Sequence, residues 1–182
     1  MSRSVLSSLV FLTALAGVCS AQDVVTAVKG TVTKVDAAGK TVAVKAADGT
    51  EHTVHIVDRT TVHGGETSLK DAKQTYYGLR KGSKVVLHYS KRGTDETAEE
   101  IDGIGKGGLK AVDGTVSKVD RGGKTITIKS AHGAEETYRL ADHATVDAGK
   151  NVGEGAEKTG KVTAYYTEEG GRKVVHFFEK AF

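Results

Sequence analysis

The sequence contains no proline and no tryptophan, and aromatic residues make up only 5% of it. This scarcity of large rings argues against a binding surface built from many aromatic side chains. The 26 lysine and arginine residues nearly balance the 23 aspartate and glutamate residues, which gives a net charge of +3. A dedicated nucleic-acid-binding domain carries a much stronger basic excess. We therefore expect neither a large aromatic platform nor a dedicated nucleic-acid signature.

The only cysteine, Cys19, lies in an N-terminal segment with the features of a secretory signal. Arg3 supplies a positive charge, residues 5–18 form an apolar stretch, and small residues precede a predicted cleavage site near Ala21. No apolar run reaches the roughly 20 residues that span a bilayer, so we expect no transmembrane segment in the mature chain. Cleavage would remove the cysteine, and with it any disulfide or thiolate ligand. These features predict a secreted or periplasmic protein.

Lipid attachment at Cys19, as in bacterial lipoproteins, is an alternative to simple cleavage. The residues Leu15-Ala16-Gly17 resemble the start of the lipoprotein pattern Leu-Ala-Gly-Cys. A branched valine, Val18, stands immediately before the cysteine, where that pattern has a small residue. This departure favours removal of the whole segment.

The rest of the chain is similar to itself. A shift of 84 positions aligns residues 30–62 with residues 114–146 without a gap, and 17 of these 33 positions are identical. Further on, GSKVVLHYSKRG from Gly82 parallels TGKVTAYYTEEG from Thr159 at a shift of 77. Such self-similarity predicts two copies of one structural unit. After a signal peptide at 1–21, we expect a first module at 22–102, a glycine-rich linker at 103–111 and a second module at 112–182.

Within each copy, β-branched residues alternate with polar or small ones. Val42 and Val44 show this period of two, as do Val85 and Leu87, and glycine-containing turns separate the runs. The pattern predicts half-buried antiparallel strands. Residues 67–82 are the exception, because TSLKDAKQTYYGLRKG favours a short helix that opens at Ser68. Many short strands with one helical insertion predict an all-β chain of two small barrels.

The order of turn and core residues resembles a small secreted bacterial β-barrel module of unknown function, which is related in shape to the OB-fold. The second copy matches this order from Gly114 to Val146 but lacks the S-L-x-D segment. The resemblance implies two tandem antiparallel OB-like barrels, the first with the helical insertion, and it gives no catalytic residues to carry over to this chain. We expect no cofactor. In the first copy the matching positions are Gly30, Val32, Val35, Asp36, Gly39, Asp48, Gly49, Asp58, Thr61, Ser68, Leu69, Asp71, Leu79, Gly82, Val85, Gly93, Ala98 and Ile101.

Both copies contain Gly-Lys-Thr, the end of a phosphate-binding loop motif. That motif, G-x-x-x-x-G-K-[ST], needs an earlier glycine where this chain has Lys34 and Lys118, and it needs a helix afterwards. The residues that follow here have the pattern of a strand. Asp36 and Gly39, at the first and fourth positions, suit a type I turn with a left-handed residue that closes a hairpin. We therefore predict a hairpin at each copy of the motif.

A second glycine motif, GIGKGG at residues 103–108, matches G-x-G-x-x-G. A dinucleotide site would need a helix directly after it. A predicted strand of the second copy follows instead, and we therefore interpret this stretch as the linker.

The first copy is rich in histidine, which is a common metal ligand. His55, His63 and His88 leave open a zinc or copper site, because imidazole suits both metals. The alternative is that these residues are solvated or hydrogen-bonded at the surface. The second-copy counterparts of His55 and His63 are Arg139 and Asp147. Arginine is not a metal ligand, so we do not expect the site to be duplicated.

The sequence gives no support for catalysis. It has no G-x-S-x-G nucleophile motif. Two adjacent glutamate pairs, Glu99-Glu100 and Glu135-Glu136, would face opposite sides of a strand, as expected for solvated charges. We do not expect an enzyme.

The loop at residues 67–82 is the part that the two copies do not share. It contains Tyr76 and Tyr77, closely followed by Arg80 and Lys81. Long loops over a rigid barrel often bind ligands, and OB-like barrels bind chains by stacking on aromatic rings. These four residues are the predicted ligand-binding group. The alternative is that the two tyrosines cover the end of the barrel.

Together these features predict a non-enzymatic secreted or periplasmic module that binds an unknown envelope or extracellular ligand. Two alternatives remain open. One is zinc or copper binding through the histidines of the first module. The other is binding of an oligosaccharide or single-stranded nucleic acid by an OB-like face.

Overall fold

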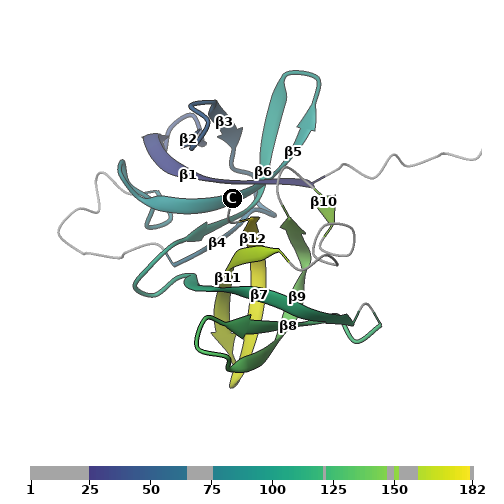
Figure 1. Ribbon diagram of the computed structural model, residues 1–182. Helices are drawn as coiled ribbons and strands as arrows, with labels where there is room; N and C mark the ends of the chain where they lie inside the picture. The colour runs from purple at the N-terminus through teal and green to yellow at the C-terminus, as the bar shows by residue number, and fades with distance from the viewer. Residues whose placement is uncertain (1–24, 65–75, 121, 147–149, 152–159, 181–182) are drawn as a thin grey trace, which may run out of the picture.

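The computed structural model describes residues 25–64, 76–120, 122–146, 150–151 and 160–180, and in these ranges the regular secondary structure consists of β-strands. The first six strands are β1 (Val25–Asp36), β2 (Thr41–Ala46), β3 (Glu51–His55), β4 (Thr61–His63), β5 (Lys84–Arg92) and β6 (Asp95–Gly103). The other six are β7 (Lys110–Asp120), β8 (Thr125–Ser130), β9 (Glu135–Val146), β10 (Lys150–Asn151), β11 (Lys161–Glu169) and β12 (Arg172–Lys180). In Figure 1, β1, β2 and β3 lie at the top of the molecule and β7 and β8 at the bottom.

Strands β1–β6 form one sheet, called here the first barrel. The strand order is β3-β2-β1-β5-β6-β4, and an additional pairing of β3 with β6 closes a ring of five strands. This closure is typical of a small OB-type barrel and confirms the predicted all-β, OB-like architecture. The expectation of purely antiparallel pairing is wrong, because β3 and β4 each run parallel to β6.

Strands β7–β12 form a second sheet. Its order is β10-β9-β12-β11-β7-β8. An additional pairing of β9 with β8 connects β9, β12, β11, β7 and β8 in a ring. Here β9 and β12 form the parallel pair. Both sheets contain the same bulge, at Val32/Lys34 between β1 and β2 and at Val116/Lys118 between β7 and β8.

Each sheet encloses its own apolar core. In the first barrel the alternating residues predicted from the sequence, such as Val42, Val85 and Leu87, are fully buried. In the second sheet, Ile126, Ile128 and the bulky Phe178 have the same role. Burial of each such side chain contributes about 1.5–3 kcal/mol, so these cores are the main source of stability.

The Gly-Lys-Thr motifs lie in hairpins, as predicted. In the first barrel the motif joins β1 to β2, and Asp36 Oδ1 accepts a hydrogen bond from the Gly39 amide at 2.8 Å. The left-handed residue of the turn is Lys40, with φ of 50°, and Gly39 instead leaves room for the Asp36 carboxylate. Lys124, with φ of 47°, occupies the equivalent place between β7 and β8.

The predicted helical insertion is not supported. Ser68 lies outside the described residues, and the part of the insertion that is described begins as a tight turn. In that turn Tyr76 and Leu79 exchange two backbone hydrogen bonds of 3.1 and 3.0 Å. The predicted signal segment and Cys19 also lie outside the described residues. In the described ranges, no helix has the length and apolar character needed to cross a bilayer.

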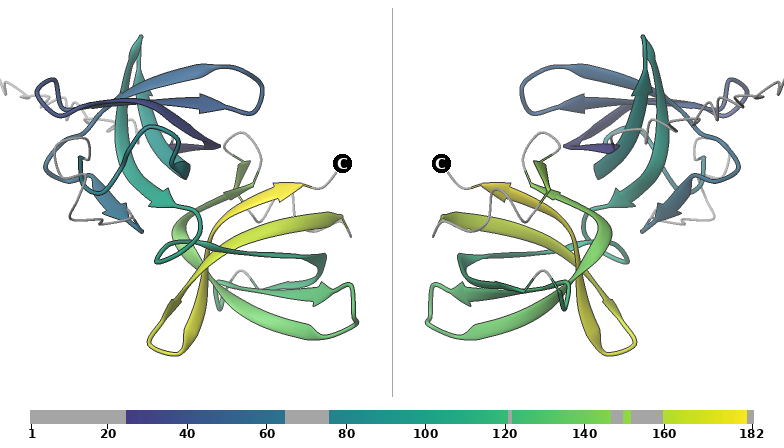
Figure 2. Two further views of the ribbon diagram at one scale, coloured as in Figure 1. Left: turned by 90° about the vertical axis from the view of Figure 1, so that its left-hand side faces the viewer. Right: turned by 90° about the vertical axis from the view of Figure 1, so that its right-hand side faces the viewer.

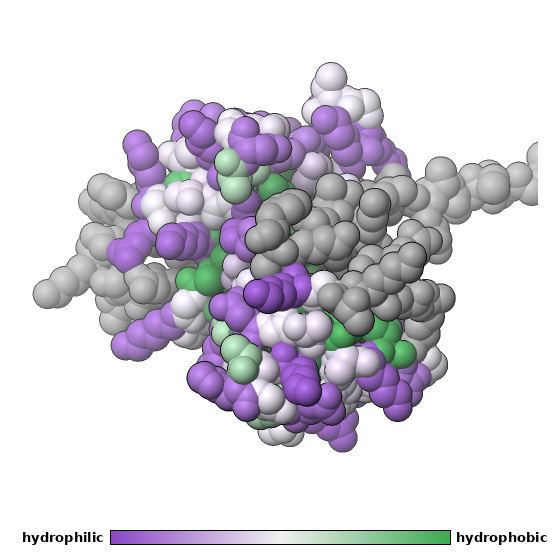
Figure 3. Space-filling view, viewed as in Figure 1, coloured by the Kyte–Doolittle hydropathy of each residue, from purple (hydrophilic) through white to green (hydrophobic). Residues whose placement is uncertain are grey.

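The first barrel packs against the second sheet, as the side views in Figure 2 show. A third apolar cluster fills this junction, with Ala27 and Val86 from the first barrel, Leu109 from the connection, and Tyr165 and Phe177 from the second sheet. The view in Figure 3 shows hydrophilic residues over much of the surface, with smaller apolar areas between them. The junction therefore buries apolar side chains on the outer faces of β5 and β12, among them Val86 and Phe177.

Candidate metal centre

The outer face of strands β4, β5 and β6 gathers histidine and carboxylate side chains. Because alternate residues of a strand share a face, Glu100 and Asp102 on β6 point to the same side. On the neighbouring strands, His88 pairs directly with Glu100, and His63 pairs directly with Asp102. Strand register therefore brings four potential metal ligands from three strands together.

A fifth side chain reaches this group from the second sheet. His176 is the extra residue of a β-bulge in β12, since Tyr165 pairs with Phe177 while Tyr166 pairs with Val175. A bulge changes the direction in which a side chain points. His176 lies against Glu100 and Asp102 of the first barrel, so the cluster spans the junction.

The three imidazoles present the same ring nitrogen to the two carboxylates. His63 Nδ1 lies 3.0 Å from Asp102 Oδ1 and 3.2 Å from Glu100 Oε1. His176 Nδ1 lies 3.5 Å from Glu100 Oε1 and 3.7 Å from Asp102 Oδ2. His88 Nδ1 lies 3.5 Å from Glu100 Oε2. One ligand atom each from His63, Glu100 and Asp102 lie within 4.8 Å of one another, close enough to hold one ion.

The cluster is buried on one side and open on the other. The side chains of His88 and Asp102 are 0% and 1% exposed, whereas that of His63 is 53% exposed. Both ring nitrogens of His88, Nδ1 of His176 and Oδ2 of Asp102 are buried and have no hydrogen-bond partner. Each such group costs about 1–3 kcal/mol if it is left unsatisfied. The centre therefore has buried nitrogen and oxygen atoms that lack a binding partner, and it is open to solvent beside His63.

Charge and burial act on the carboxylates in opposite ways. Burial disfavours the anion of Glu100, but contacts with His176 and His88 outweigh this effect and hold its pKa well below the usual range. Burial and the nearby Glu100 raise the pKa of Asp102. For His176, burial lowers the pKa, and the interaction with Glu100 more than offsets it, so the pKa is raised. The site thus favours positive charge next to Glu100.

A hydroxyl group orients His176. Thr167 Oγ1 donates its only proton to Glu169 Oε1 at 2.8 Å, and it also lies 2.9 Å from His176 Nε2. The hydroxyl oxygen must therefore accept a hydrogen bond from Nε2–H of His176. In the neutral ring this leaves the Nδ1 lone pair directed at Glu100 and Asp102. Metal-binding histidines commonly have such a second hydrogen bond.

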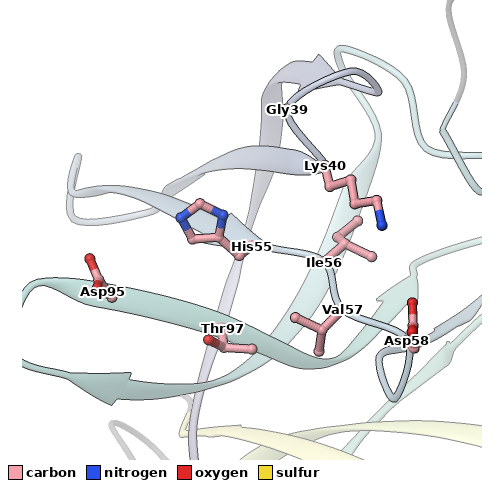
Figure 4. Close-up of a pocket in the computed structure, with 8 residues that line it drawn as sticks. All are labelled: Gly39, Lys40, His55, Ile56, Val57, Asp58, Asp95 and Thr97. Atoms are coloured by element: carbon pink, nitrogen blue, oxygen red, sulfur yellow. The ribbon is translucent and has the colours of Figure 1, made fainter.

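His55, the third histidine predicted from the sequence, lies elsewhere. It is at the end of β3 and pairs with Thr97. Figure 4 shows it in a separate surface pocket of about 620 Å³, which Lys40, Asp58 and Asp95 also line. Of the predicted metal ligands, the structure therefore brings together His63 and His88 and leaves His55 apart.

The sequence interpretation missed three members of the cluster. Glu100 was expected to be a solvated charge, but its side chain is only 12% exposed. The neighbouring Glu99 binds Arg59 and Ser90, so the expectation of solvated charges is wrong for both. Asp102 follows Glu100 at a spacing of two, which places both on one face of a strand. This spacing indicates a shared site only when the histidines on the neighbouring strands are known. For His176, the sequence offers no signal of its approach from the other sheet.

The second sheet has no equivalent centre at the corresponding strand positions. At a shift of 77, the counterparts of His88, Glu100 and Asp102 are Tyr165, Phe177 and Glu179. Tyr165 and Phe177 instead pack into the apolar part of the junction. The five-residue cluster therefore belongs to the first barrel with one residue added by the second sheet.

The predicted ligand-binding loop is described from Tyr76 onward. Tyr76 packs against the core of the first barrel, and Tyr77 is 62% exposed. The two rings meet edge to face with centroids 4.6 Å apart. Arg80 and Lys81 follow in the turn before β5, and Lys81 is exposed. Binding of an oligosaccharide or nucleic acid by these four residues stays a prediction.

The sequence matches no protein-family model, and no curated protein matches it. Among solved structures the chain is similar to "CusF-Ag(I)" from Escherichia coli, with 16% identity and a TM-score of 0.36 over 47% of this chain and 98% of that one. Its similarity to apo-CusF from the same organism has 15% identity and a TM-score of 0.35, over 50% of this chain and 100% of that one.

A further similarity is to Drosophila "Unr CSD456", with 15% identity and a TM-score of 0.37. It covers 86% of this chain and 62% of that one. The TM-scores of all three matches are below 0.5.

Proposed function

We propose that this protein binds a divalent transition-metal ion at the cluster of His63, His88, Glu100, Asp102 and His176. The observation that carries the proposal is a pair of buried ring nitrogens without hydrogen-bond partners: Nδ1 of His88 faces Glu100, and Nδ1 of His176 faces both Glu100 and Asp102. A divalent cation would satisfy these atoms and balance both negative charges. In this proposal the protein is a secreted or periplasmic binding protein without catalytic activity.

The spacing of the ligand atoms suits zinc or divalent copper. Zinc bonds to imidazole nitrogen and carboxylate oxygen are about 2.0–2.2 Å long, which places the ligands of a tetrahedral ion about 3.4 Å apart. The nitrogen–oxygen distances in the cluster, from 3.0 to 3.7 Å, bracket this separation. Small side-chain adjustments would therefore be enough to admit an ion.

The ligand types favour a divalent ion over monovalent copper or silver. Soft monovalent ions prefer thiolate and thioether sulfur, whereas imidazole and carboxylate suit zinc and divalent copper. The chain has one methionine and one cysteine, at positions 1 and 19, far in sequence from every cluster residue. We therefore expect zinc and divalent copper to bind more tightly than silver.

Calorimetric titration of tag-free protein with zinc, divalent copper and silver tests the proposal. We expect one zinc or copper ion per chain, and a loss of at least tenfold in affinity for His176→Ala and for Glu100→Gln. Glu100→Gln retains the shape of the side chain, which guards against simple misfolding. His55→Ala is the matched control, because it removes an exposed histidine of the same barrel that lies outside the cluster.

Two results would contradict the proposal. One is the absence of stoichiometric zinc or copper binding to the unsubstituted protein. The other is an equal loss of affinity for His55→Ala and His176→Ala, which would indicate scattered surface sites. Turnover of hydrolase substrates that is lost on single substitutions would contradict the non-enzymatic part of the proposal.

A further inference from the structure

A cleft of about 590 Å³ lies where the first barrel meets the second sheet, and it shares no residue with the metal centre. Strands β1, β2 and β5 contribute Lys29, Lys45 and Lys84 to its lining, and β11 contributes Tyr165. Its volume is in the range of pockets that bind small molecules, about 300–1,000 Å³. Neither sheet forms this cleft alone.

Strand register fixes two of the three lysines. Thr31 on β1 pairs with Lys45 on one side and with Lys84 on the other. Both lysines are exposed, and within the described part of the chain neither has an ion-pair partner. Two positive charges therefore stand on either side of one strand, at the rim of the cleft.

The third lysine is held in place. Lys29 Nζ donates a hydrogen bond to Tyr165 Oη at 3.1 Å and also binds Glu179. Burial opposes the charge of Lys29, but the bonds to Glu179 and Tyr165 prevail and raise its pKa. An ammonium group has three donors, so Lys29 retains one beyond these two contacts.

Small apolar side chains complete the lining. Ala46 is buried, Ile104 is half-buried, and Ala47 and Ala111 are exposed at the edge. A pocket lined mainly by apolar residues, with a few convergent polar groups, is the usual form of a small-molecule site. Here the polar groups are cationic, so a matching ligand needs an apolar body and an anionic head.

The second sheet contains the same lysine pair, and neither lysine of that pair lines this cleft. Thr115 pairs with Lys129 and Lys161, at the same register as Thr31 with Lys45 and Lys84. The counterpart of Lys29, at a shift of 84, is Asp113, which accepts a hydrogen bond from Thr163. The chain therefore offers an internal control, because Lys129 and Lys161 form an equivalent lysine pair outside this cleft.

We propose that this cleft binds a small amphipathic anion, with an alkyl chain against Ala46 and Ile104 and a carboxylate or phosphate head beside Lys45, Lys84 and Lys29. The proposal is independent of the metal centre. Carboxylate and phosphate heads share the chemistry that the lysines recognise, and the two arms of the experiment distinguish them.

Nuclear magnetic resonance titration of the isotopically labelled full chain tests this site. The probes are octyl phosphate, octanoate, inorganic phosphate and octyltrimethylammonium, each in chelator-treated, metal-free buffer. We expect the two octyl anions to shift the amide signals of Thr31, Ala46 and Ala47, and the tighter one to identify the preferred head group. The double variant Lys45→Glu with Lys84→Glu should weaken this binding at least tenfold.

The matched control is Lys129→Glu with Lys161→Glu, which makes the same charge change on the second sheet and should leave the affinity within twofold. A second variant, Ala111→Phe, fills the edge of the cleft without a charge change and should also weaken binding. Equal losses in both double variants would overturn the proposal. So would inorganic phosphate binding as tightly as octyl phosphate, or the cation shifting the same signals.

Discussion

His176 has one ring nitrogen committed to a hydroxyl and the other directed at two carboxylates. Thr167 Oγ1 accepts a hydrogen bond from Nε2, and Nδ1 faces Glu100 and Asp102. The same hydroxyl is held by Glu169, so a chain of three side chains sets the proton position on the imidazole. In the proposed centre, Thr167 is a positioning residue that would not touch the ion.

Replacement of Thr167 by valine tests this role. Valine has a similar shape but no hydroxyl, so His176 loses the partner that keeps Nδ1 free to bind an ion. Loss of such an outer contact typically costs 10–100-fold in metal affinity. We expect a reduction of this size in zinc affinity by calorimetry, with little change in the free energy of unfolding.

The control for this variant is Thr163→Val on the same strand, whose hydroxyl binds Asp113 and not the centre. Zinc affinity should be unchanged in Thr163→Val. Equal affinities of the two variants would show that the Thr167 hydroxyl has no role in binding.

Single residues were predictable where their chemistry is local. His63 and His88 could be selected from sequence because histidine is a frequent metal ligand, and both are in the cluster. His55 has the same chemistry, but it pairs with Thr97 near the start of β6. His88 and His63 pair with Glu100 and Asp102 farther along the same strand, so the strand register excludes His55 from the cluster. Glu100 seemed solvated because its three histidine contacts come from other strands, His63 and His88 in its own barrel and His176 in the second sheet.

At the scale of the strands, β-bulges set the direction of side chains that regular alternation does not predict. The pairings of β5 with β6 and of β11 with β12 each shift register once, at Glu99 and at His176. Alternation predicted most of the strands and their buried faces correctly. It could not locate the extra residues, because a bulge shifts the alternation by one residue: Ala98 and Ile101 on β6 both lie in the core of the first barrel although an odd number of positions separates them.

The close packing of β1 on β2, and of β7 on β8, depends on one glycine in each pair, Gly30 and Gly114. A Cβ atom at Gly30 would lie 2.6 Å from Lys45 O and from Val44 Cγ1. At Gly114 the corresponding contacts are 2.5 Å to Ile128 Cγ2 and 2.6 Å to Lys129 O. Because the close atoms include backbone, neither position can relax easily.

We therefore expect Gly30→Ala and Gly114→Ala each to lower the free energy of unfolding by about 1–3 kcal/mol, as overpacked sites do. Urea denaturation measures this change. Gly122→Ala is the control, since its nearest contact would be an ordinary 3.6 Å, and it should stay within about 0.5 kcal/mol of the unsubstituted protein. A neutral Gly30→Ala would show that the strands separate without cost.

At the scale of the whole molecule, the junction joins the two sheets through apolar and polar contacts. Phe177 and Val86 contribute the apolar part, and Lys29, Tyr165 and Glu179 form a polar triad. None of these cross-sheet contacts was predictable, because repeated modules with their own cores can be connected without being packed together. The proposed metal centre and the cleft both depend on this packing.

The polar triad predicts a loss of stability in alkali. The pKa of Lys29 is raised above its ordinary value of 10.5, and burial raises the pKa of Tyr165 above 10.0. The folded protein thus holds both protons more tightly than the unfolded chain. Their contribution is fully present below these ordinary values and is lost as pH rises through the higher folded values.

Urea denaturation between pH 8 and pH 12 measures this loss. We expect the free energy of unfolding to fall above about pH 10, and to fall less steeply in the double variant Lys29→Met with Tyr165→Phe. A parallel decline in both proteins would place the alkali-sensitive groups outside the triad.

The central claim is that one metal ion is held by ligands from both sheets. The most direct measurement is a crystal structure of zinc-loaded protein, with anomalous diffraction recorded at the zinc absorption edge. We predict one strong anomalous peak about 2.0–2.2 Å from a ring nitrogen of His176 and from a carboxylate oxygen of Glu100. A peak confined to the His55 pocket, or no peak at the junction, would contradict the account.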